Sequence, residues 1–248
     1  MIYVIGTGPG KLSSMTIEAK EALDRCDIIV GYQLYIDLLK NDFQEKEFAS
    51  TPMGREIERC KLCFDYSMKG KTVAMVCSGD AGVYGMAEPI FRLQKENSVY
   101  RGEEIVVIPG VTAALSGAAL LGAPLNHDFC VISLSDLLTP WEMIERRLRA
   151  AIQGDFAMAI YNPSSHQRRD YLQKACKIMM EAGAAPERAC GYVKNIGREG
   201  CETHFCTLKE LETCEVDMFT TVFIGNSQSD FLESDKGRKL LTKRGYKL

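Results

Sequence analysis

Short apolar runs alternate with amphipathic segments along the whole chain. The runs have the length of strands, and glycine, proline or polar turn residues bound them. They predict strands at 2–5, 28–30, 72–77, 105–108, 129–134, 156–161, 189–193 and 220–224. The longer segments predict helices at 16–25, 56–68, 86–94, 112–121, 140–151 and 168–182. Strands that alternate with helices indicate an α/β fold.

Local patterns add detail to this outline. The run 72–77 is almost wholly apolar, which predicts a strand buried on both faces of a sheet. Residues 202–207 alternate in polarity, which is typical of an antiparallel strand. The strand–helix pattern restarts after an irregular stretch, so we expect two α/β domains, 1–124 and 125–248. Core positions expected in the helix 56–68 are Ile57, Leu62 and Phe64.

The composition is that of a folded, weakly acidic protein. Of the 248 residues, 46% are hydrophobic and 25% are charged, which is enough to build a core and argues against disorder. The net charge of −3 removes the usual electrostatic case for a nucleic-acid binder. The weakly polar run 111–125 contains glycines and a proline and is too short to span a bilayer. The first residues enter a strand at once, so we expect no secretory signal, no membrane partner and a cytoplasmic location.

The ten cysteines are scattered along the chain rather than grouped. Cys60 and Cys63 form a CxxC pair, but no second pair follows at zinc-site spacing. Cys201 and Cys206 flank His204, again without the spacing of a known metal site. We therefore expect reduced, free thiols and no metal.

Glycine-rich turns follow several of the predicted strands. The segment 78–85 contains three glycines and Asp80, and it follows the buried strand directly. In open α/β sheets small ligands bind at the carboxyl ends of strands, and a carboxylate there can accept hydrogen bonds from a ligand. An ordinary strand-to-helix turn is the simpler alternative. The turn 6–10 does not fit a dinucleotide fingerprint, because Lys11 stands where the last glycine belongs, and it also fails as a phosphate-binding loop.

Three further loops follow predicted strands. The loop 109–113 opens a helix, and Thr112 is suited to cap it. The loop 161–165 has the composition of a turn, and 194–199 brings two cations to a strand end, where they suit an acidic ligand or a solvated turn. No histidine belongs to a nucleophile–base pattern.

Taken together, these loops resemble the tetrapyrrole methyltransferase family, whose members use S-adenosylmethionine. The resemblance rests on Gly6-Thr7-Gly8-Pro9-Gly10, Ser78-Gly79-Asp80 with Tyr84, and Pro109-Gly110-Val111-Thr112-Ala113. A closer similarity to the precorrin-3B or cobalt-precorrin-3 C(17)-methyltransferase branch rests on Val30-Gly31-Tyr32 with Tyr35-Ile36, Met53 to Cys60, and Ala159 to Ser165. One departure is Ala81, where many family members have proline.

The resemblance implies a tetrapyrrole methylase fold of two α/β domains with the ligand cleft between them, in a homodimer. It implies S-adenosylmethionine as cofactor, S-adenosylhomocysteine as product, and a tetrapyrrole substrate that is metal-free or cobalt-loaded. The N-terminal domain would supply the tetrapyrrole trough and part of the cofactor site, and the C-terminal domain the remainder. The cofactor residues implied are Gly79, Asp80, Val83, Tyr84, Thr112, Ala113, Tyr161, Asn162, Asn195, Thr221 and Val222. The substrate residues expected are Gly8, Pro9, Gly10, Tyr32, Tyr35, Arg55, Arg59, Lys194 and Arg198.

The activity implied is methylation of carbon 17 with ring contraction in cobalamin biosynthesis. Ring contraction needs proton transfers, for which Glu56, Glu88 and His127 are the candidates. The many cysteines favour an anaerobe and hence the cobalt-loaded substrate. Alternatives are a methyltransferase of the same fold acting at another tetrapyrrole position or on RNA or protein, a non-catalytic tetrapyrrole carrier, and a nucleotide-dependent oxidoreductase. The acidic composition disfavours the RNA substrate, and the missing glycine at Lys11 disfavours the oxidoreductase.

Overall fold

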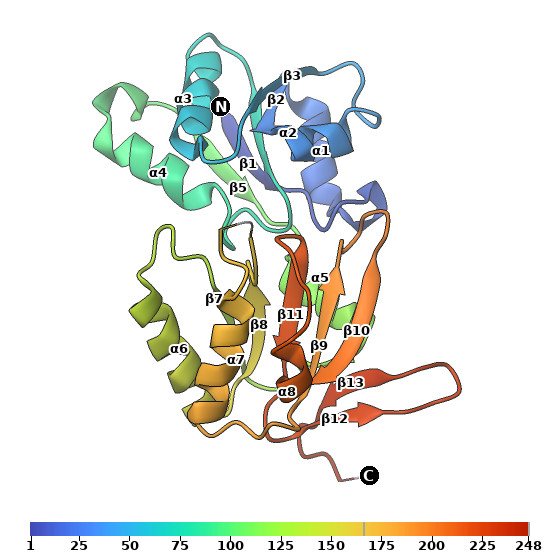
Figure 1. The fold of residues 1–248 in the computed structure, drawn as a ribbon. Coiled ribbons are helices and arrows are strands. Elements are labelled where there is room, and N and C mark those ends of the chain that lie inside the picture. Colours follow the sequence, from blue (N-terminus) through green and yellow to red (C-terminus); the bar gives the residue numbers. More distant parts are fainter. Residues whose placement is uncertain (166, 248) are drawn as a thin grey trace. The chain divides into compact units, whose positions relative to one another are not determined.

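The chain divides into two compact units in the computed structural model, which describes every residue except 166 and 248. The units are Met1–Ala113 and Ala114–Leu248, so the division lies earlier than the expected break after residue 124 (Figure 1). The helix α5 (Ala113–Leu121) explains the difference. A Cβ added at Gly117 would lie within 3 Å of the Phe223 and Ile196 side chains, so α5 packs closely on the second unit.

The first unit is built on a five-stranded sheet with the order β3-β2-β4-β1-β5. All its strand pairs are parallel, and the strands are β1 (Ile2–Gly6), β2 (Ile28–Tyr32), β3 (Glu47–Thr51), β4 (Val73–Cys77) and β5 (Ile105–Ile108). The predicted buried strand is confirmed, because every residue of β4 is buried. The strand β3 was not predicted. Because the strands are parallel, the loops that follow them all leave from one edge of the sheet.

Helices cover both faces of this sheet. They are α1 (Ile17–Arg25), α2 (Gln33–Leu39), α3 (Glu56–Ser67) and α4 (Ala87–Glu96), with 3-10 turns at Leu12–Ser14 and Ser98–Tyr100. Residues such as Val4 and Met75 pack in the cluster that contains α3 and α4, whereas Ile5 and Val76 pack with α1 and α2. The alternation of neighbouring strand residues between two clusters is what a two-sided, buried sheet requires.

The core face of α3 differs from the sequence prediction. Phe64 is fully buried as expected, but Leu62 is half-buried and Ile57 is exposed. The buried residues of the helix are Arg59, Cys60, Cys63, Phe64 and Ser67. The prediction for Ile57 was wrong because the face of α3 that packs in the apolar cluster carries Cys60, Cys63 and Phe64, and Ile57 does not lie on that face.

The second unit contains a mixed five-stranded sheet with the order β10-β9-β11-β8-β7. Its strands are β7 (Phe129–Ser133), β8 (Ala157–Tyr161), β9 (Ala189–Lys194), β10 (Glu202–Thr207) and β11 (Thr220–Ile224). The helices α6 (Trp141–Gln153), α7 (Tyr171–Glu181) and the short α8 (Leu208–Leu211) pack in one apolar cluster with it. The predicted antiparallel strand is confirmed as β10. Because β7, β8 and β9 run in one direction and β11 in the other, the first three end at the edge where β11 begins.

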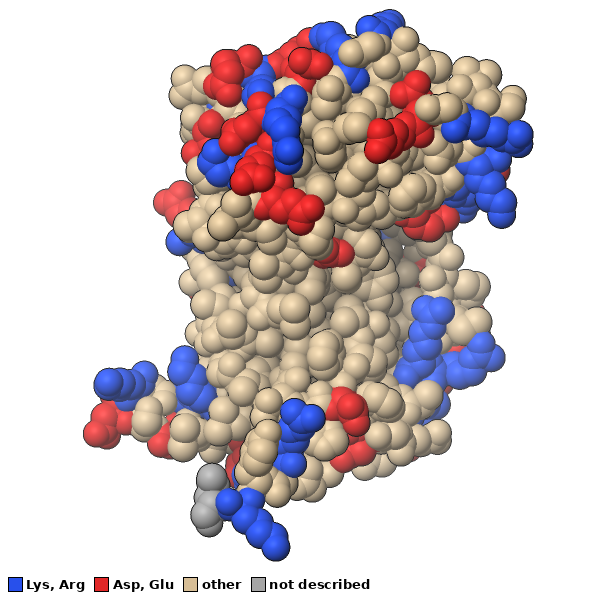
Figure 2. Space-filling view, turned by 180° about the vertical axis from the view of Figure 1, so that it is seen from behind, with Lys and Arg blue, Asp and Glu red and all other residues tan. Residues whose placement is uncertain are grey.

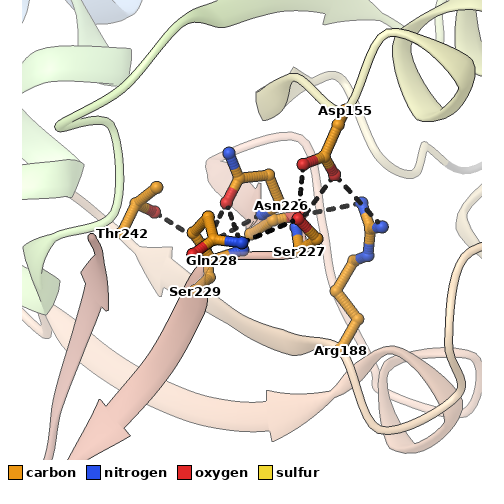
Figure 3. Close-up of polar contacts among 8 residues, drawn as sticks. Asp155, Arg188, Asn226, Ser227, Gln228, Ser229 and Thr242 are labelled. Carbon is orange, nitrogen blue, oxygen red and sulfur yellow. Dashed lines mark hydrogen bonds and ion pairs between the residues drawn. The ribbon is translucent and has the colours of Figure 1, made fainter. Parts of the chain in front are cut away.

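A small third sheet joins β6 (Gly122–Ala123), β12 (Ser229–Leu232) and β13 (Lys239–Thr242). Polar contacts fix the turn before it, as Figure 3 shows. The Ser227 backbone N–H and hydroxyl donate to the Asp155 carboxylate at 2.9 and 2.6 Å, and Arg188 lies 3.5 Å from Asp155. Ser229 and Thr242 share a hydrogen bond of 2.7 Å. Asp155 lies before β8, Arg188 before β9 and Ser227 after β11. They therefore lie at the edge opposite the carboxyl ends of β7, β8 and β9.

Acidic and basic side chains both occur on the visible face of each unit, as Figure 2 shows, in keeping with a net charge of −3. Among the described residues, no helix has the length and hydropathy needed to cross a lipid bilayer.

Candidate functional site

Backbone contacts bring the first two glycine-rich loops of unit 1 together. The Gly8 N–H donates to the Gly79 carbonyl at 3.0 Å, and the Gly79 N–H donates to the Gly8 carbonyl at 2.7 Å. Both residues have positive φ, of 72° and 69°, which an L side chain rarely adopts. The loops that follow β1 and β4 therefore form one surface at the carboxyl edge of the sheet, which we call the glycine surface.

The Asp80 carboxylate adds the loop that follows β5 to this surface. One carboxylate oxygen accepts from the Gly82 N–H at 2.8 Å, and the other accepts from the Gly110 N–H at 3.0 Å. The sequence prediction gave Asp80 to a ligand, but each of its oxygens already accepts a hydrogen bond from the protein backbone. Asp80 thus organises the loops of the edge. A carboxylate has further lone pairs, and the binding of a ligand by Asp80 stays a prediction.

The three loops approach one another so closely that side chains are excluded between them. A Cβ at Gly110 would lie 2.2 Å from the Gly79 carbonyl oxygen and 2.4 Å from that of Gly6. A Cβ at Gly6 would lie 2.7 Å from the Gly110 nitrogen. Glycine is required at both positions because backbone atoms cannot move aside as a flexible side chain can.

Three expected cofactor residues hold strained backbone conformations. Among the described residues, four that are not glycine have positive φ, and they include Tyr84 at 53°, Asn162 at 52° and Asn195 at 50°. Such conformations cost of the order of 1–3 kcal/mol each and cluster at ligand sites. Tyr84 is also 58% exposed, which is unusual for a large aromatic side chain. These outliers support a ligand site at the loops that carry them.

The expected cofactor residues of unit 2 gather at the edge where β8 and β9 end and β11 begins. The Asn162 side-chain amide donates to the Ser133 hydroxyl at 2.9 Å, and the Asn195 N–H donates to the Phe219 carbonyl at 3.1 Å. The Tyr161 hydroxyl accepts from the Ala114 N–H, in the first turn of α5, at 2.8 Å. Thr221 and Val222 are buried in β11, close to its start. One sheet edge thus brings these residues together.

A polar cluster at the same edge was missed from the sequence. Asp136 accepts a hydrogen bond of 2.6 Å from the Tyr171 hydroxyl and pairs with Arg168 at 3.0 Å. The hydrogen bond to Asp136 raises the pKa of the Tyr171 hydroxyl. The cluster ties the segment after β7 to the segment after β8. The position of Asp136, two residues after the predicted strand 129–134, was the signal available in the sequence.

The expected substrate residues lie on both units. On unit 1, the rings of Tyr32 and Tyr35 meet edge to face at 5.3 Å, and exposed Arg55 lies 3.8 Å from Glu58. The turn of Gly8, Pro9 and Gly10 belongs to the glycine surface described above. On unit 2, the Lys194 ammonium lies 5.8 Å from the Tyr192 ring centre, and the Arg198 guanidinium lies 5.1 Å from that of Phe219. Arg59 differs from these cations because it is buried.

The structure separates the three acid–base candidates. Glu56 and Glu88 lie in the first turns of α3 and α4, near the carboxyl edge of the first sheet. Glu56 accepts from the Gly54 N–H at 3.1 Å, and Glu88 pairs with Arg92 at 3.4 Å. His127 precedes β7. Tyr161 ends β8 and Asn195 follows β9, and both of these strands run parallel to β7. The fold of unit 2 therefore does not bring His127 to the edge that holds those two residues.

All ten cysteines are free thiols. Burial raises the pKa of Cys60 to about 12 and that of Cys77 to about 11, so both stay protonated at neutral pH. In the part of the chain that the structure describes, no three His, Cys, Asp or Glu side chains are grouped as metal ligands.

The expected cofactor residues fit S-adenosylmethionine by their chemistry. They offer hydroxyl, amide and backbone groups that can bind adenosine and an amino acid by hydrogen bonds. They include one carboxylate, Asp80, and no lysine or arginine, so nothing among them repels a sulfonium cation. The buried Ser165 hydroxyl, three residues after Asn162, has no hydrogen-bond partner in the structure. A ligand group at this loop would satisfy it.

Comparison with known proteins agrees with this geometry. Residues 1–212 match the model of the tetrapyrrole (corrin/porphyrin) methylases. The chain is 42% identical to a probable cobalt-factor III C(17)-methyltransferase of Salmonella typhimurium, with 100% of each chain covered. It is 37% identical to a precorrin-3B C(17)-methyltransferase of Sinorhizobium sp, covering 94% of this chain and 92% of the relative. The solved structure of the methyltransferase CobJ superposes with a TM-score of 0.89 at 34% identity, covering 98% of this chain and 99% of the other. The chain therefore belongs to the tetrapyrrole (corrin/porphyrin) methylase family and has its fold.

Proposed function

We propose that this protein is an S-adenosylmethionine-dependent methyltransferase that methylates carbon 17 of precorrin-3B or cobalt-precorrin-3 with ring contraction, in cobalamin biosynthesis. The observation that carries the proposal is the glycine surface of unit 1, where Asp80 joins the loops that follow β4 and β5. Full-length similarity to C(17)-methyltransferases supports the position of methylation.

The cofactor residues proposed lie on both sheet edges. S-adenosylmethionine supplies an activated methyl group when bound. On unit 1, the loop 79–84 and the segment 112–113 present backbone groups and the Tyr84 ring to it. On unit 2, we assign Asn162 and Asn195 to hydrogen bonds with its polar groups, and Tyr161 to the support of α5, through its bond to Ala114. The Asn162 amide donates to the Ser133 hydroxyl at 2.9 Å and the Asn195 amide to the Gly200 carbonyl at 3.3 Å, so hydrogen bonds within unit 2 hold both side chains before any ligand arrives.

The substrate carries several carboxylate groups, which suit the arginine and lysine side chains of the two units. The Arg55 side chain is 67% exposed, and its one ion pair with a described residue is the 3.8 Å contact with Glu58, so a substrate carboxylate can recruit it at little cost. Lys194 and Arg198 stand at the edge of the second sheet beside aromatic rings. Tyr32 and Tyr35 offer aromatic surface for the flat macrocycle.

The residues act mainly by positioning. A methyl transfer between two bound molecules needs no covalent bond to the protein, and holding reactants in line can supply about 7–11 kcal/mol of a barrier. Protons are moved by Glu56 or Glu88, the two candidates that lie at the carboxyl edge of the first sheet. We also propose that the protein is cytoplasmic and acts as a homodimer.

Incubation of the protein without oxygen, with S-adenosylmethionine and either metal-free or cobalt-loaded precursor, tests the proposal. Mass analysis of the product should show one added methyl group, and the preferred precursor identifies the substrate. Binding of precursor without any methyl transfer would instead favour the alternative that the protein is a non-catalytic tetrapyrrole carrier. Methylation at another carbon would move the assignment to a different member of the same family.

A further inference from the structure

Arg59 is the most unusual charged side chain of the first unit. It lies on α3, is only 4% exposed, and faces the apolar cluster that contains Cys60 and Cys63. Its guanidinium donates to the Pro52 carbonyl at 3.2 Å and contacts the Met86 sulfur at 3.6 Å. Its Nε is buried and has no hydrogen-bond partner among the residues that the structure describes. A buried guanidinium that leaves a donor unused is costly and calls for an explanation.

Arg59 forms no ion pair with any residue that the structure describes. Among the described residues, no carboxylate lies within 4 Å of the Arg59 guanidinium, although Arg55 and Arg92 on the same unit each have one. The neighbouring thiols do not supply a negative charge either. Burial holds the pKa of Cys60 at about 12 and that of Cys77 at about 11, so both are neutral at physiological pH. Arginine itself stays protonated, so the positive charge persists.

A second orphaned polar atom lies next to the Arg59 contact. Thr51, the last residue of β3, is 5% exposed, and its hydroxyl has no hydrogen-bond partner in the described part of the chain. It directly precedes Pro52, whose carbonyl accepts from Arg59. The segment 52–55 above them is exposed throughout, and a Cβ at Gly54 would meet no atom within 4 Å. The segment that follows Thr51 and supplies the Pro52 carbonyl to Arg59 is thus exposed and, at Gly54, loosely packed.

We propose that Thr51 and Arg59 form an internal receptor for one carboxylate of the tetrapyrrole substrate, entered when the segment 52–55 moves aside. The incoming carboxylate displaces the Pro52 carbonyl from the guanidinium. It accepts from the nitrogen thus released, from the Arg59 Nε on the same edge, and from the Thr51 hydroxyl. A two-point contact between a guanidinium and a carboxylate is the strongest geometry open to this side chain. The inference rests on the proposed function, because it assigns a partner to a substrate group. It explains why the unbound protein keeps an unpaired charge in its interior.

The substitution Arg59→Met tests the receptor through porphyrin affinity and Tm. Loss of an arginine with a purely structural role would leave porphyrin affinity unchanged and would lower the Tm. The probes are uroporphyrin III, an octacarboxylate tetrapyrrole, and coproporphyrin III, which lacks its acetate groups. We expect the variant to bind uroporphyrin about 10- to 100-fold more weakly, as loss of a charge-assisted hydrogen bond predicts. We expect its Tm to rise by about 2–4 °C or more, because an apolar side chain replaces an unpaired buried charge. Affinity for S-adenosylhomocysteine, measured by calorimetry, should stay unchanged.

Matched variants separate the explanations. Arg101→Met removes the same charge from an exposed site before β5 and should leave porphyrin affinity unchanged. Thr51→Val should weaken uroporphyrin binding several-fold, and Arg59→Lys should fall between wild type and Arg59→Met. Wild-type uroporphyrin affinity in Arg59→Met would overturn the receptor, and so would a large drop in Tm. If Arg59→Met fails to fold, Arg59→Lys takes its place, and wild-type uroporphyrin affinity in that variant would overturn the receptor. A wild-type protein that binds S-adenosylhomocysteine but neither porphyrin would instead contradict the proposed function.

Discussion

The Asp80 carboxylate accepts a hydrogen bond of 3.0 Å from the Gly110 N–H, thirty residues further along the chain. Its other oxygen accepts from Gly82 at 2.8 Å, so a single side chain fixes the shape of its own loop and joins it to the loop after β5. Hydrogen bonds to a charged acceptor are the stronger kind, at about 1.5–3 kcal/mol each.

Asp80→Ala should therefore damage cofactor binding by disordering two loops. We expect affinity for S-adenosylhomocysteine, measured by calorimetry, to fall at least about 10-fold. Asp80→Asn keeps one acceptor oxygen and should lose less. Asp42→Ala removes an exposed carboxylate from the same unit and should change nothing. Equal affinities in Asp80→Ala and wild type would contradict this role of the aspartate.

Gly110→Ala should separate the three loops of unit 1. The added Cβ would lie 2.2 Å from the Gly79 carbonyl oxygen, so backbone must move, and we expect a loss of about 1–3 kcal/mol in the free energy of unfolding. Urea denaturation measures this loss. Gly102→Ala is the matched control, because a Cβ there meets no atom within 4 Å. The idea of a close-packed glycine surface would be wrong if the two variants were equally stable.

The left-handed backbone of Asn162 predicts an order of stabilities. At a φ of 52°, alanine is strained and glycine is not, so Asn162→Gly should be more stable than Asn162→Ala by about 1 kcal/mol. Both variants lose the 2.9 Å bond to Ser133 and should bind S-adenosylhomocysteine more weakly. At exposed Asn126, which is not among the residues with positive φ, glycine should not be the more stable variant. Denaturant unfolding measures the stabilities of the four variants. If glycine were more stable than alanine at both positions, the result would contradict backbone strain at Asn162.

Arg55→Ala should weaken substrate binding without changing stability. The ion pair with Glu58 is 3.8 Å long and largely exposed, so its loss should cost less than about 1 kcal/mol. A porphyrin titration should show reduced affinity, most clearly at low salt, while affinity for S-adenosylhomocysteine stays constant. Unchanged porphyrin affinity in the variant would remove Arg55 from the substrate site.

The thiols should differ sharply in reactivity. Cys201 is exposed, whereas burial raises the pKa of Cys130 to about 11 and that of Cys26 to about 12. Because the thiolate is the reactive form, iodoacetamide at neutral pH should label Cys201 first in the folded protein. Peptide mass analysis over time measures the order, and equal labelling of Cys26 would show that the core is open.

Most strands could be predicted because they are short, apolar and bounded by turn residues. The run 72–77 is buried on both sides, and such a strand has a clear sequence pattern. The edge strand β3 has the sequence Glu-Phe-Ala-Ser-Thr, whose polarity hides it. The hairpin of β12 and β13 was also missed, because its position depends on contacts with residues distant in sequence, such as that of the Thr242 hydroxyl with the Pro124 carbonyl.

The loops of the site could be predicted from glycines at strand ends, but the roles of their side chains could not. Hydropathy places Ile57 inside and Arg59 outside, whereas the structure has the reverse, because the fold of α3 against β4 decides which face is buried. The sequence likewise identified Asp80 without revealing that its two oxygens already hold the backbone of neighbouring loops. Partners that are distant in the chain decide such roles.

The most direct measurement is a crystal structure of the protein with S-adenosylhomocysteine. The ligand should contact the loop 79–84 that Asp80 organises and the loop residues Asn162 and Asn195, with open space beside its sulfur for a macrocycle. Binding at any other place, or a sulfur enclosed on all sides by protein, would contradict the proposal that this protein methylates a tetrapyrrole.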